Sequence, residues 1–172
     1  MNEFLASVER RAYRMAYIAT GNREEALDIV QDAMFKLAQR YADRNAEEWG
    51  PLFQHILQSR IRDWYRRTRV RSVWQRFTGG GVEEAGDPMD RFSGSGAEEP
   101  LKRTGEQMAI DRLDEVLREL PLRQQQAFLL RVWEGLGVRD TARAMGCSEG
   151  SVKTHYSRAV HRVCELLEKH WP

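Results

Sequence analysis

A chain of 172 residues, with 27 Lys and Arg against 26 Asp and Glu, has room for one domain or two small ones and is close to neutral. It contains no apolar run long enough to cross a membrane and no signal-peptide core, and its two cysteines make no disulfide framework. We therefore expect a cytoplasmic protein without a membrane anchor, in which any contact with nucleic acid depends on segregated charge rather than net charge.

The N-terminal part of the chain, residues 1–77, has the apolar spacing of helices. A first stripe consists of Leu5, Val8, Ala12, Met15 and Ala19. After an interruption at Gly21 and Asn22, a second stripe consists of Leu27, Val30, Met34, Leu37 and Tyr41. A loop over residues 43–50 is expected next, followed by a long helix that Pro51 opens, because proline is tolerated in the first turn of a helix.

The outer face of the second helix carries an aromatic residue among polar ones. Its members are Asp28, Gln31, Asp32 and Phe35. An outward phenylalanine among acids indicates a protein-docking surface with an aromatic anchor. The alternative, a singly exposed aromatic without a role, is common and stays open.

The third helix carries a polar and basic stripe at steps of four and three residues. The stripe consists of His55, Ser59, Arg62, Arg66 and Arg69, opposite an apolar side made of Phe53, Leu57, Ile61 and Trp64. Seven arginines stand between Arg60 and Arg76, against the single acid Asp63. This concentration of charge suits a nucleic-acid backbone, and the nearby aromatics can stack on unpaired bases. A solvated helix face is the alternative.

Residues 78–107 interrupt the helical pattern. They include three consecutive glycines, two prolines and a surplus of acids. Such a composition predicts a flexible linker, and a stretch of this length indicates two domains, 1–77 and 108–172.

The segment from Val138 to Val160 reads as two short helices around a tight turn. Gly146 is placed to end the first helix in the left-handed conformation, and Ser148 is placed to cap the second. This is the layout of a helix-turn-helix, whose second helix enters the DNA major groove. The residues expected at DNA are Ser148, Glu149, Gly150, Ser151, Lys153, Thr154, Ser157 and Arg158. An ordinary amphipathic helix with a solvated face is the alternative.

The sequence thus predicts an all-α fold of two small helical domains joined by a flexible linker, the C-terminal one a helix-turn-helix. We expect no cofactor, no metal site and no catalysis, because the chain lacks a P-loop, an HExxH motif and a nucleophile elbow. A dimeric helix-turn-helix regulator is a competing interpretation, although it would leave the arginine stripe unexplained. An RNA-binding adaptor that uses the same arginines is another.

Three segments in this order resemble the extracytoplasmic-function group of bacterial sigma factors. They are EEALDIVQDAMFKLAQR, PLFQHILQSRIRDWYRR and LPLRQQQAFLLRVWEGLGVRDTARAMGCSEGSVKTHYSRAV. The resemblance implies two helical domains, regions two and four, that bind core RNA polymerase and promoter DNA, and it makes an anti-sigma partner plausible. The chain departs from the group's pattern at Ser59, where asparagine is frequent, and at His155 and Tyr156, where many members have Arg and Leu.

The resemblance also implies roles for the residues singled out above. Asp28, Gln31, Asp32 and Phe35 match the helix that docks on the polymerase. Residues 44–50 and the helix from His55 to Arg67 match the part that melts and reads the minus-ten element, and Arg69, which continues the polar stripe, is expected to bind that element with them. Residues 148–158 match the part that reads the minus-thirty-five element, and the linker would run through the polymerase.

Overall fold

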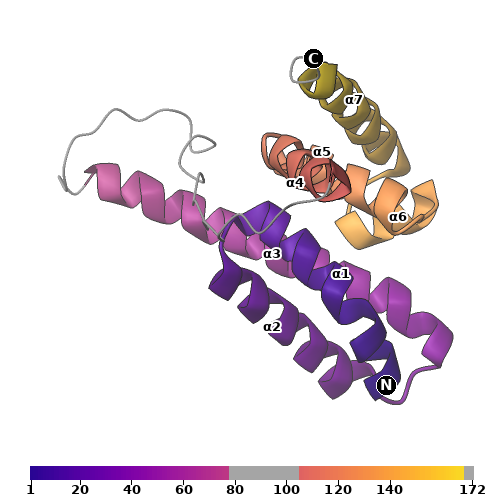
Figure 1. Cartoon of the computed structure of the whole chain (residues 1–172). Coiled ribbons are helices and arrows are strands. Elements are labelled where there is room, and N and C mark those ends of the chain that lie inside the picture. Colours follow the sequence, from indigo (N-terminus) through magenta and orange to yellow (C-terminus); the bar gives the residue numbers. More distant parts are fainter. Residues whose placement is uncertain (78–104, 169–172) are drawn as a thin grey trace.

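The computed structural model describes residues 1–77 and 105–168, and the elements in these ranges are all helices (Figure 1). In chain order they are α1 (Asn2–Thr20), α2 (Arg23–Tyr41), α3 (Ala46–Phe77), α4 (Gly105–Arg118), α5 (Leu122–Phe128), the π-helical turn η1 (Leu129–Trp133), α6 (Val138–Met145) and α7 (Glu149–Glu168). The expected all-α class is confirmed. Most of the predicted linker lies outside the described residues, but its last three positions, 105–107, form the first turn of α4, since a first helical turn needs no apolar residue.

The first two helices form a hairpin whose turn is encoded locally. Gly21 ends α1 with φ 65°, and its N–H donates to the Tyr17 carbonyl at 2.8 Å. Asn22 caps α2, because its Oδ1 accepts hydrogen bonds from the N–H groups of Glu24 and Glu25 at 2.9 and 3.1 Å. These two residues therefore reverse the chain and let α1 and α2 pack side by side.

The buried side of α2 differs from the predicted stripe. Leu27, expected in the core, is 40% exposed. The residues of α2 that are buried are Ala26, Ile29, Val30, Ala33 and Leu37. Two of these positions are alanines, whose small side chains let α2 approach its neighbours closely. The predicted stripe was drawn from large apolar residues and therefore did not include them.

The long helix α3 begins five residues before Pro51, where a loop was expected. A proline at this position removes one amide hydrogen bond, to the carbonyl four residues earlier. Tertiary contacts of Trp49 offset this loss: its ring lies 5.9 Å from that of Phe4, and its indole N–H donates to the Tyr41 carbonyl at 3.0 Å. The first turn of α3 is thereby attached to both α1 and α2.

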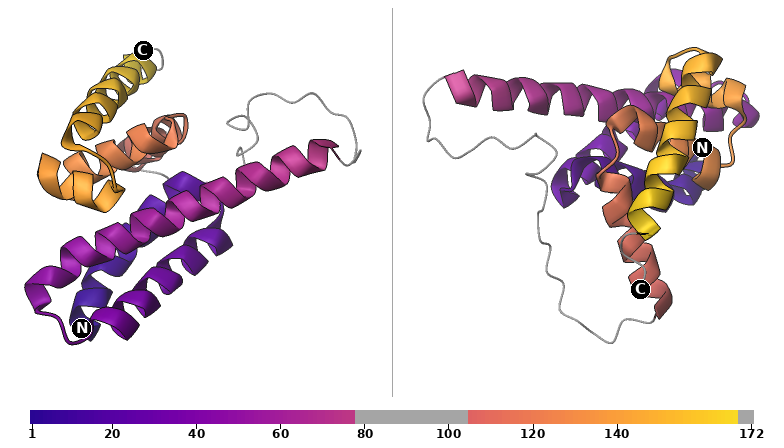
Figure 2. Two further views of the ribbon diagram at one scale, coloured as in Figure 1. Left: turned by 180° about the vertical axis from the view of Figure 1, so that it is seen from behind. Right: turned by 90° about the horizontal axis from the view of Figure 1, so that it is seen from above.

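The N-terminal half (residues 2–77) and the C-terminal half (residues 105–168) pack against each other. One apolar cluster contains residues of both, among them Ile18, Leu57, Leu117 and Leu120. Figures 1 and 2 show the C-terminal half lying against α1 and α3, while the last turns of α3 extend beyond the helical bundle. A second, smaller apolar cluster joins α5, η1, α6 and α7 within the C-terminal half, around Leu130, Met145 and Val152.

Candidate nucleic-acid interface

The turn between α6 and α7 has the geometry of a helix-turn-helix. Gly146 adopts φ 62° and ψ 47° at the end of α6, a conformation that costs a residue with a Cβ about 1–2 kcal/mol. Ser148 Oγ accepts a hydrogen bond from the Ser151 N–H at 3.1 Å. The structure therefore places both predicted turn residues in the conformations expected of them.

The helix α7 buries one side and exposes the other. Val152, Ala159, Val163 and Leu166 face the core. Ser151 is half-buried, and its hydroxyl lies 2.9 Å from that of Ser148. The other predicted DNA-facing side chains are exposed, namely Ser148, Glu149, Gly150, Lys153, Thr154, Ser157 and Arg158. The exposed face contains no large aliphatic residue, so it can approach a groove closely and present hydroxyls and cations to it.

One histidine lies at the margin of this face. Burial lowers the pKa of His155 below its ordinary value, and the positive charges of Arg123 and Arg158 lower it further. The neutral imidazole is thus favoured, and the positive charge of the face comes from Lys153 and Arg158.

The polar stripe of α3 is divided by its contact with the C-terminal half. His55 Nδ1 lies 2.8 Å from the Arg143 carbonyl of α6, and Ser59 and Arg62 are half-buried. Arg66 and Arg69 are exposed, and Arg66 pairs with Asp63 at 2.8 Å. The opposite side of the helix is buried as predicted, at Phe53, Leu57, Ile61 and Trp64.

Arg62 lies next to the turn of the helix-turn-helix. Its Nη2 is 3.7 Å from the point where a Cβ on Gly146 would stand. Burial lowers the pKa of Arg62 from its ordinary value, and the nearby charge of Arg123 lowers it further. The Arg62 Nη1 is buried and has no hydrogen-bond partner among the described residues. The guanidinium is therefore less well satisfied than it would be in water or against an anion.

The predicted docking residues form an open surface on α2. Asp28, Gln31 and Asp32 are exposed. Phe35 is 67% exposed, which makes it the most exposed large apolar side chain in the part of the chain that the structure describes. An aromatic ring in water is a strong candidate for burial by a partner.

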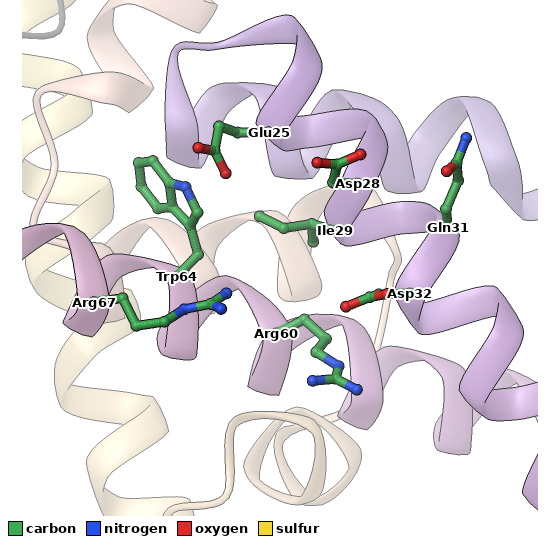
Figure 3. A pocket seen from close by; sticks show the side chains of 8 residues that line it. All are labelled: Glu25, Asp28, Ile29, Gln31, Asp32, Arg60, Trp64 and Arg67. Carbon is green, nitrogen blue, oxygen red and sulfur yellow. The ribbon is translucent and has the colours of Figure 1, made fainter.

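A pocket of 310 Å³ between α2 and α3 extends this surface (Figure 3). Arg60 and Arg67 of α3 face the pocket opposite Glu25, Asp28 and Asp32 of α2, with Trp64 and Ile29 at its base. The charged lining differs from the mostly apolar one of a small-molecule site. Glu25, Arg60 and Arg67 were not among the residues expected at the docking surface. Their spacing could have indicated it, since Glu25, Asp28 and Asp32 recur at helical steps, as do Arg60, Trp64 and Arg67.

Within the described ranges, no three His, Cys, Asp or Glu residues are grouped so as to hold a metal ion. Within the same ranges, no helix has both the length and the apolarity that a membrane span requires.

The chain is similar to sigma factors along most of its length. Residues 110–163 match the family described as Sigma-70, region 4. The chain is 30% identical to RNA polymerase sigma factor SigV of Bacillus subtilis, over 91% of this chain and 84% of SigV. It is 27% identical to ECF RNA polymerase sigma factor BldN of Streptomyces coelicolor, over 90% of this chain and 55% of BldN.

The fold is similar to that of the sigma factor RpoE from Bartonella quintana, solved in complex with the anti-sigma factor NepR. The TM-score is 0.68, the sequence identity is 24%, and the match covers 97% of this chain and 96% of RpoE. The likeness therefore takes in the helices of both halves.

Proposed function

Because this chain belongs to the extracytoplasmic-function group of RNA polymerase sigma factors, we propose that it binds core RNA polymerase, directs it to promoters and starts transcription there. Sigma factors are initiation factors and not enzymes, so the chain itself carries out no covalent chemistry. The observation that supports the proposal most directly is the similarity to SigV, which covers 91% of this chain and 84% of SigV.

The outer face of α7 is proposed to read the minus-thirty-five element. It is the exposed second helix of a helix-turn-helix, and its small residues permit close approach to base edges. Lys153 and Arg158 would contact phosphates and fix the register of the helix on the duplex.

The polar stripe of α3 is proposed to bind the minus-ten element once its strands separate. Capture of flipped bases by a protein offsets the stacking energy that melting costs. The members of the stripe that would take part are His55, Ser59, Arg62, Arg66 and Arg69.

The exposed surface of α2 is proposed to dock on the polymerase. Asp28, Gln31 and Asp32 would supply polar contacts around the ring of Phe35, which is the kind of residue that carries most of the energy of an interface. The protein would work where the polymerase works, in the cytoplasm.

An anti-sigma protein is a proposed further partner. The supporting observation is that RpoE, which shares this fold, was crystallised with the anti-sigma factor NepR. No residue of this chain is assigned to that contact.

The test is run-off transcription with core polymerase and a pool of promoter fragments from the host. Transcripts that depend on this chain would support the proposal, and their start sites would supply the promoter motif. The double variant Lys153→Ala, Arg158→Ala should bind core normally but lower transcript yield at least tenfold, since each lost phosphate contact weakens DNA binding. Arg162→Ala is the matched control, because Arg162 is an exposed arginine of α7 outside the proposed face and pairs with Glu165.

Failure of the chain to bind core polymerase would contradict the proposal. A helix-turn-helix regulator would bind duplex DNA without the polymerase, and an RNA-binding adaptor would prefer RNA to promoter DNA.

A further inference from the structure

The pocket between α2 and α3 has two walls of opposite charge. On α2, Glu25, Asp28 and Asp32 line one wall, and on α3 the guanidinium groups of Arg60 and Arg67 line the other (Figure 3). A cavity of 310 Å³ lies between them, and no salt bridge joins the two walls within the described residues. We call this arrangement the charged pocket. Its opposite charges are held apart, so a charged group that enters between them can pair with either wall.

Arg60 brings a buried, unpaired nitrogen to the charged pocket. Its side chain is half-buried, and its Nε has no hydrogen-bond partner among the described residues. A buried N–H of a charged group is costly when it lacks an acceptor. A carboxylate that entered the pocket could supply the acceptor, because a guanidinium and a carboxylate form a charge-assisted pair with two parallel hydrogen bonds.

The arginines of the charged pocket lie apart from the polar stripe of α3. Arg60 and Arg62 are two positions apart in the sequence, which places them about 200° apart around the helix. His55 of the stripe accordingly contacts α6, whereas Arg60 and Arg67 face α2. The pocket also contains three carboxylates against two guanidinium groups, and this surplus of negative charge disfavours a nucleic-acid phosphate there. Arg60 and Arg67 are therefore poorly placed to serve the surface proposed for the minus-ten element.

A single charge cannot satisfy both walls of the charged pocket. A lone cation would pair with the carboxylates of α2 but lie close to the two arginines, and a lone anion would have the reverse difficulty. Neighbouring acidic and basic side chains of a protein supply both charges together, since residues three or four apart on a helix have Cβ atoms about 5–6 Å apart. The charge pattern therefore fits a protein segment with adjacent acidic and basic side chains.

The charged pocket is continuous with the surface proposed to dock on the polymerase. Asp28, Gln31 and Asp32 belong to both. Phe35 lies on the same side of α2, two turns from Asp28, and is 67% exposed. A partner that covers the Phe35 ring would also lie next to the pocket. An apolar anchor beside charged groups is the usual composition of a protein interface.

We propose that Arg60 and Arg67 bind protein rather than DNA: they form the second wall of the polymerase docking site and take an acidic side chain of the polymerase, while Glu25, Asp28 and Asp32 take a basic side chain beside it. This inference rests on the proposed function of α2. It extends the docking site from one helix to two. It also divides the arginines of α3 by task, those of the polar stripe to promoter DNA and those facing α2 to the polymerase.

The test is titration of the labelled full-length chain with core polymerase. Arg60→Gln and Arg67→Gln should each weaken binding about tenfold, because each leaves a carboxylate of the partner without its opposite charge. Arg60→Lys keeps the charge and should lose less affinity than Arg60→Gln. The matched control is Arg10→Gln, the same loss of charge at an exposed arginine of α1 outside the pocket, and it should leave the affinity unchanged. Circular dichroism establishes that each variant is folded.

Binding of a short labelled single strand of DNA, measured with each chain saturated by core polymerase, is the second readout. Arg60→Gln and Arg67→Gln should weaken strand binding no more than Arg10→Gln does, since each removes one positive charge outside the proposed DNA surface. A larger loss of strand affinity than in the control would assign these arginines to DNA and overturn the proposal.

A cross-link identifies the group that Arg60 meets. In Arg60→Lys, a carbodiimide activates a carboxylate in contact with the new amine, the two form an amide, and the carbodiimide leaves as a urea. In the complex, mass spectrometry should find this amine joined to an aspartate or glutamate of the polymerase, and Arg10→Lys should give no such product.

Cross-links from Arg60→Lys that join only carboxylates of this chain would overturn the proposal. So would core affinities of Arg60→Gln and Arg67→Gln equal to that of Arg10→Gln, while the parent chain binds core normally. Failure of the parent chain itself to bind core would overturn the proposed function, and this inference with it.

Discussion

Phe35 is an apolar ring that folding leaves in water. It stands on the outer side of α2 and is 67% exposed, next to Asp32 and one turn from Gln31. Its truncation should therefore leave the core intact. Phe35 can contribute to binding if a partner covers it, but it contributes little to the stability of the fold.

We expect Phe35→Ala to weaken binding to core polymerase by at least tenfold, because a buried aromatic anchor contributes about 2 kcal/mol or more to an interface. The midpoint of thermal unfolding should stay within the error of the parent chain. The affinity is measured by titrating labelled chain with core enzyme. Val132→Ala, which truncates another exposed apolar residue, in η1, is the control. Unaltered affinity in Phe35→Ala would remove the anchor from the docking surface.

The turn between α6 and α7 shows how far an element is determined by single residues. Gly146 has φ 62°, whereas Gly150, four residues later, lies in the first turn of α7 with ordinary helical backbone. A Cβ on Gly150 would meet nothing closer than the Ser148 Oγ at 3.9 Å. The same substitution at these two positions therefore has opposite consequences.

Gly146→Ala should lower the free energy of unfolding by about 1–2 kcal/mol, the cost of a left-handed residue that carries a Cβ. Gly150→Ala should raise it by up to about 1 kcal/mol, because alanine restricts the unfolded chain and suits a helix. Urea denaturation followed by circular dichroism measures both. Equal effects of the two substitutions would mean that the turn is not held in the left-handed conformation.

Local signals made the elements predictable, and tertiary contacts account for the exceptions. The turns at Gly21 and Gly146 follow from one glycine and one capping side chain each, so sequence alone located them. The start of α3 was predicted wrongly because Pro51 is a strong local signal, and the contacts of Trp49 that override it come from α1 and α2. The exposure of Leu27 depends in the same way on which side of α2 its neighbours occupy.

The division of the polar stripe on α3 lies beyond any local signal. His55, Ser59 and Arg62 were grouped with Arg66 and Arg69 by their spacing, which fixes the side of the helix but not what lies against it. Arg143, which His55 contacts, is 88 residues away from it in the sequence, and Gln126 is 68 residues away from its partner Gln58 on the same helix. Nothing in either segment alone indicates that they meet, since the amide and carbonyl groups involved are common to most helices.

At the scale of the whole molecule, two apolar clusters divide the core unevenly. The larger cluster contains residues of both halves, and the smaller one belongs to the C-terminal half alone. Polar contacts support the larger one: Arg14 pairs with Asp114 at 3.0 Å, and the guanidinium of Arg118 lies 4.7 Å from the ring centre of Tyr17. The two halves are therefore held together by apolar and polar contacts at the same time.

Leu117 tests this division of the core. It is 1% exposed in the larger cluster, and its carbonyl accepts from Gln125 Nε2, which also lies 3.4 Å from the Ile18 carbonyl of α1. Leu117→Ala should lower the free energy of unfolding by about 2–5 kcal/mol and speed amide hydrogen exchange in the last turns of α1 as well as in α4. Met145→Ala, in the smaller cluster, should speed exchange in α6 and α7 and leave α1 protected. Exchange is followed by mass spectrometry at peptide resolution. Protection of α1 that is unaffected by Leu117→Ala would mean that the two halves fold without support from each other.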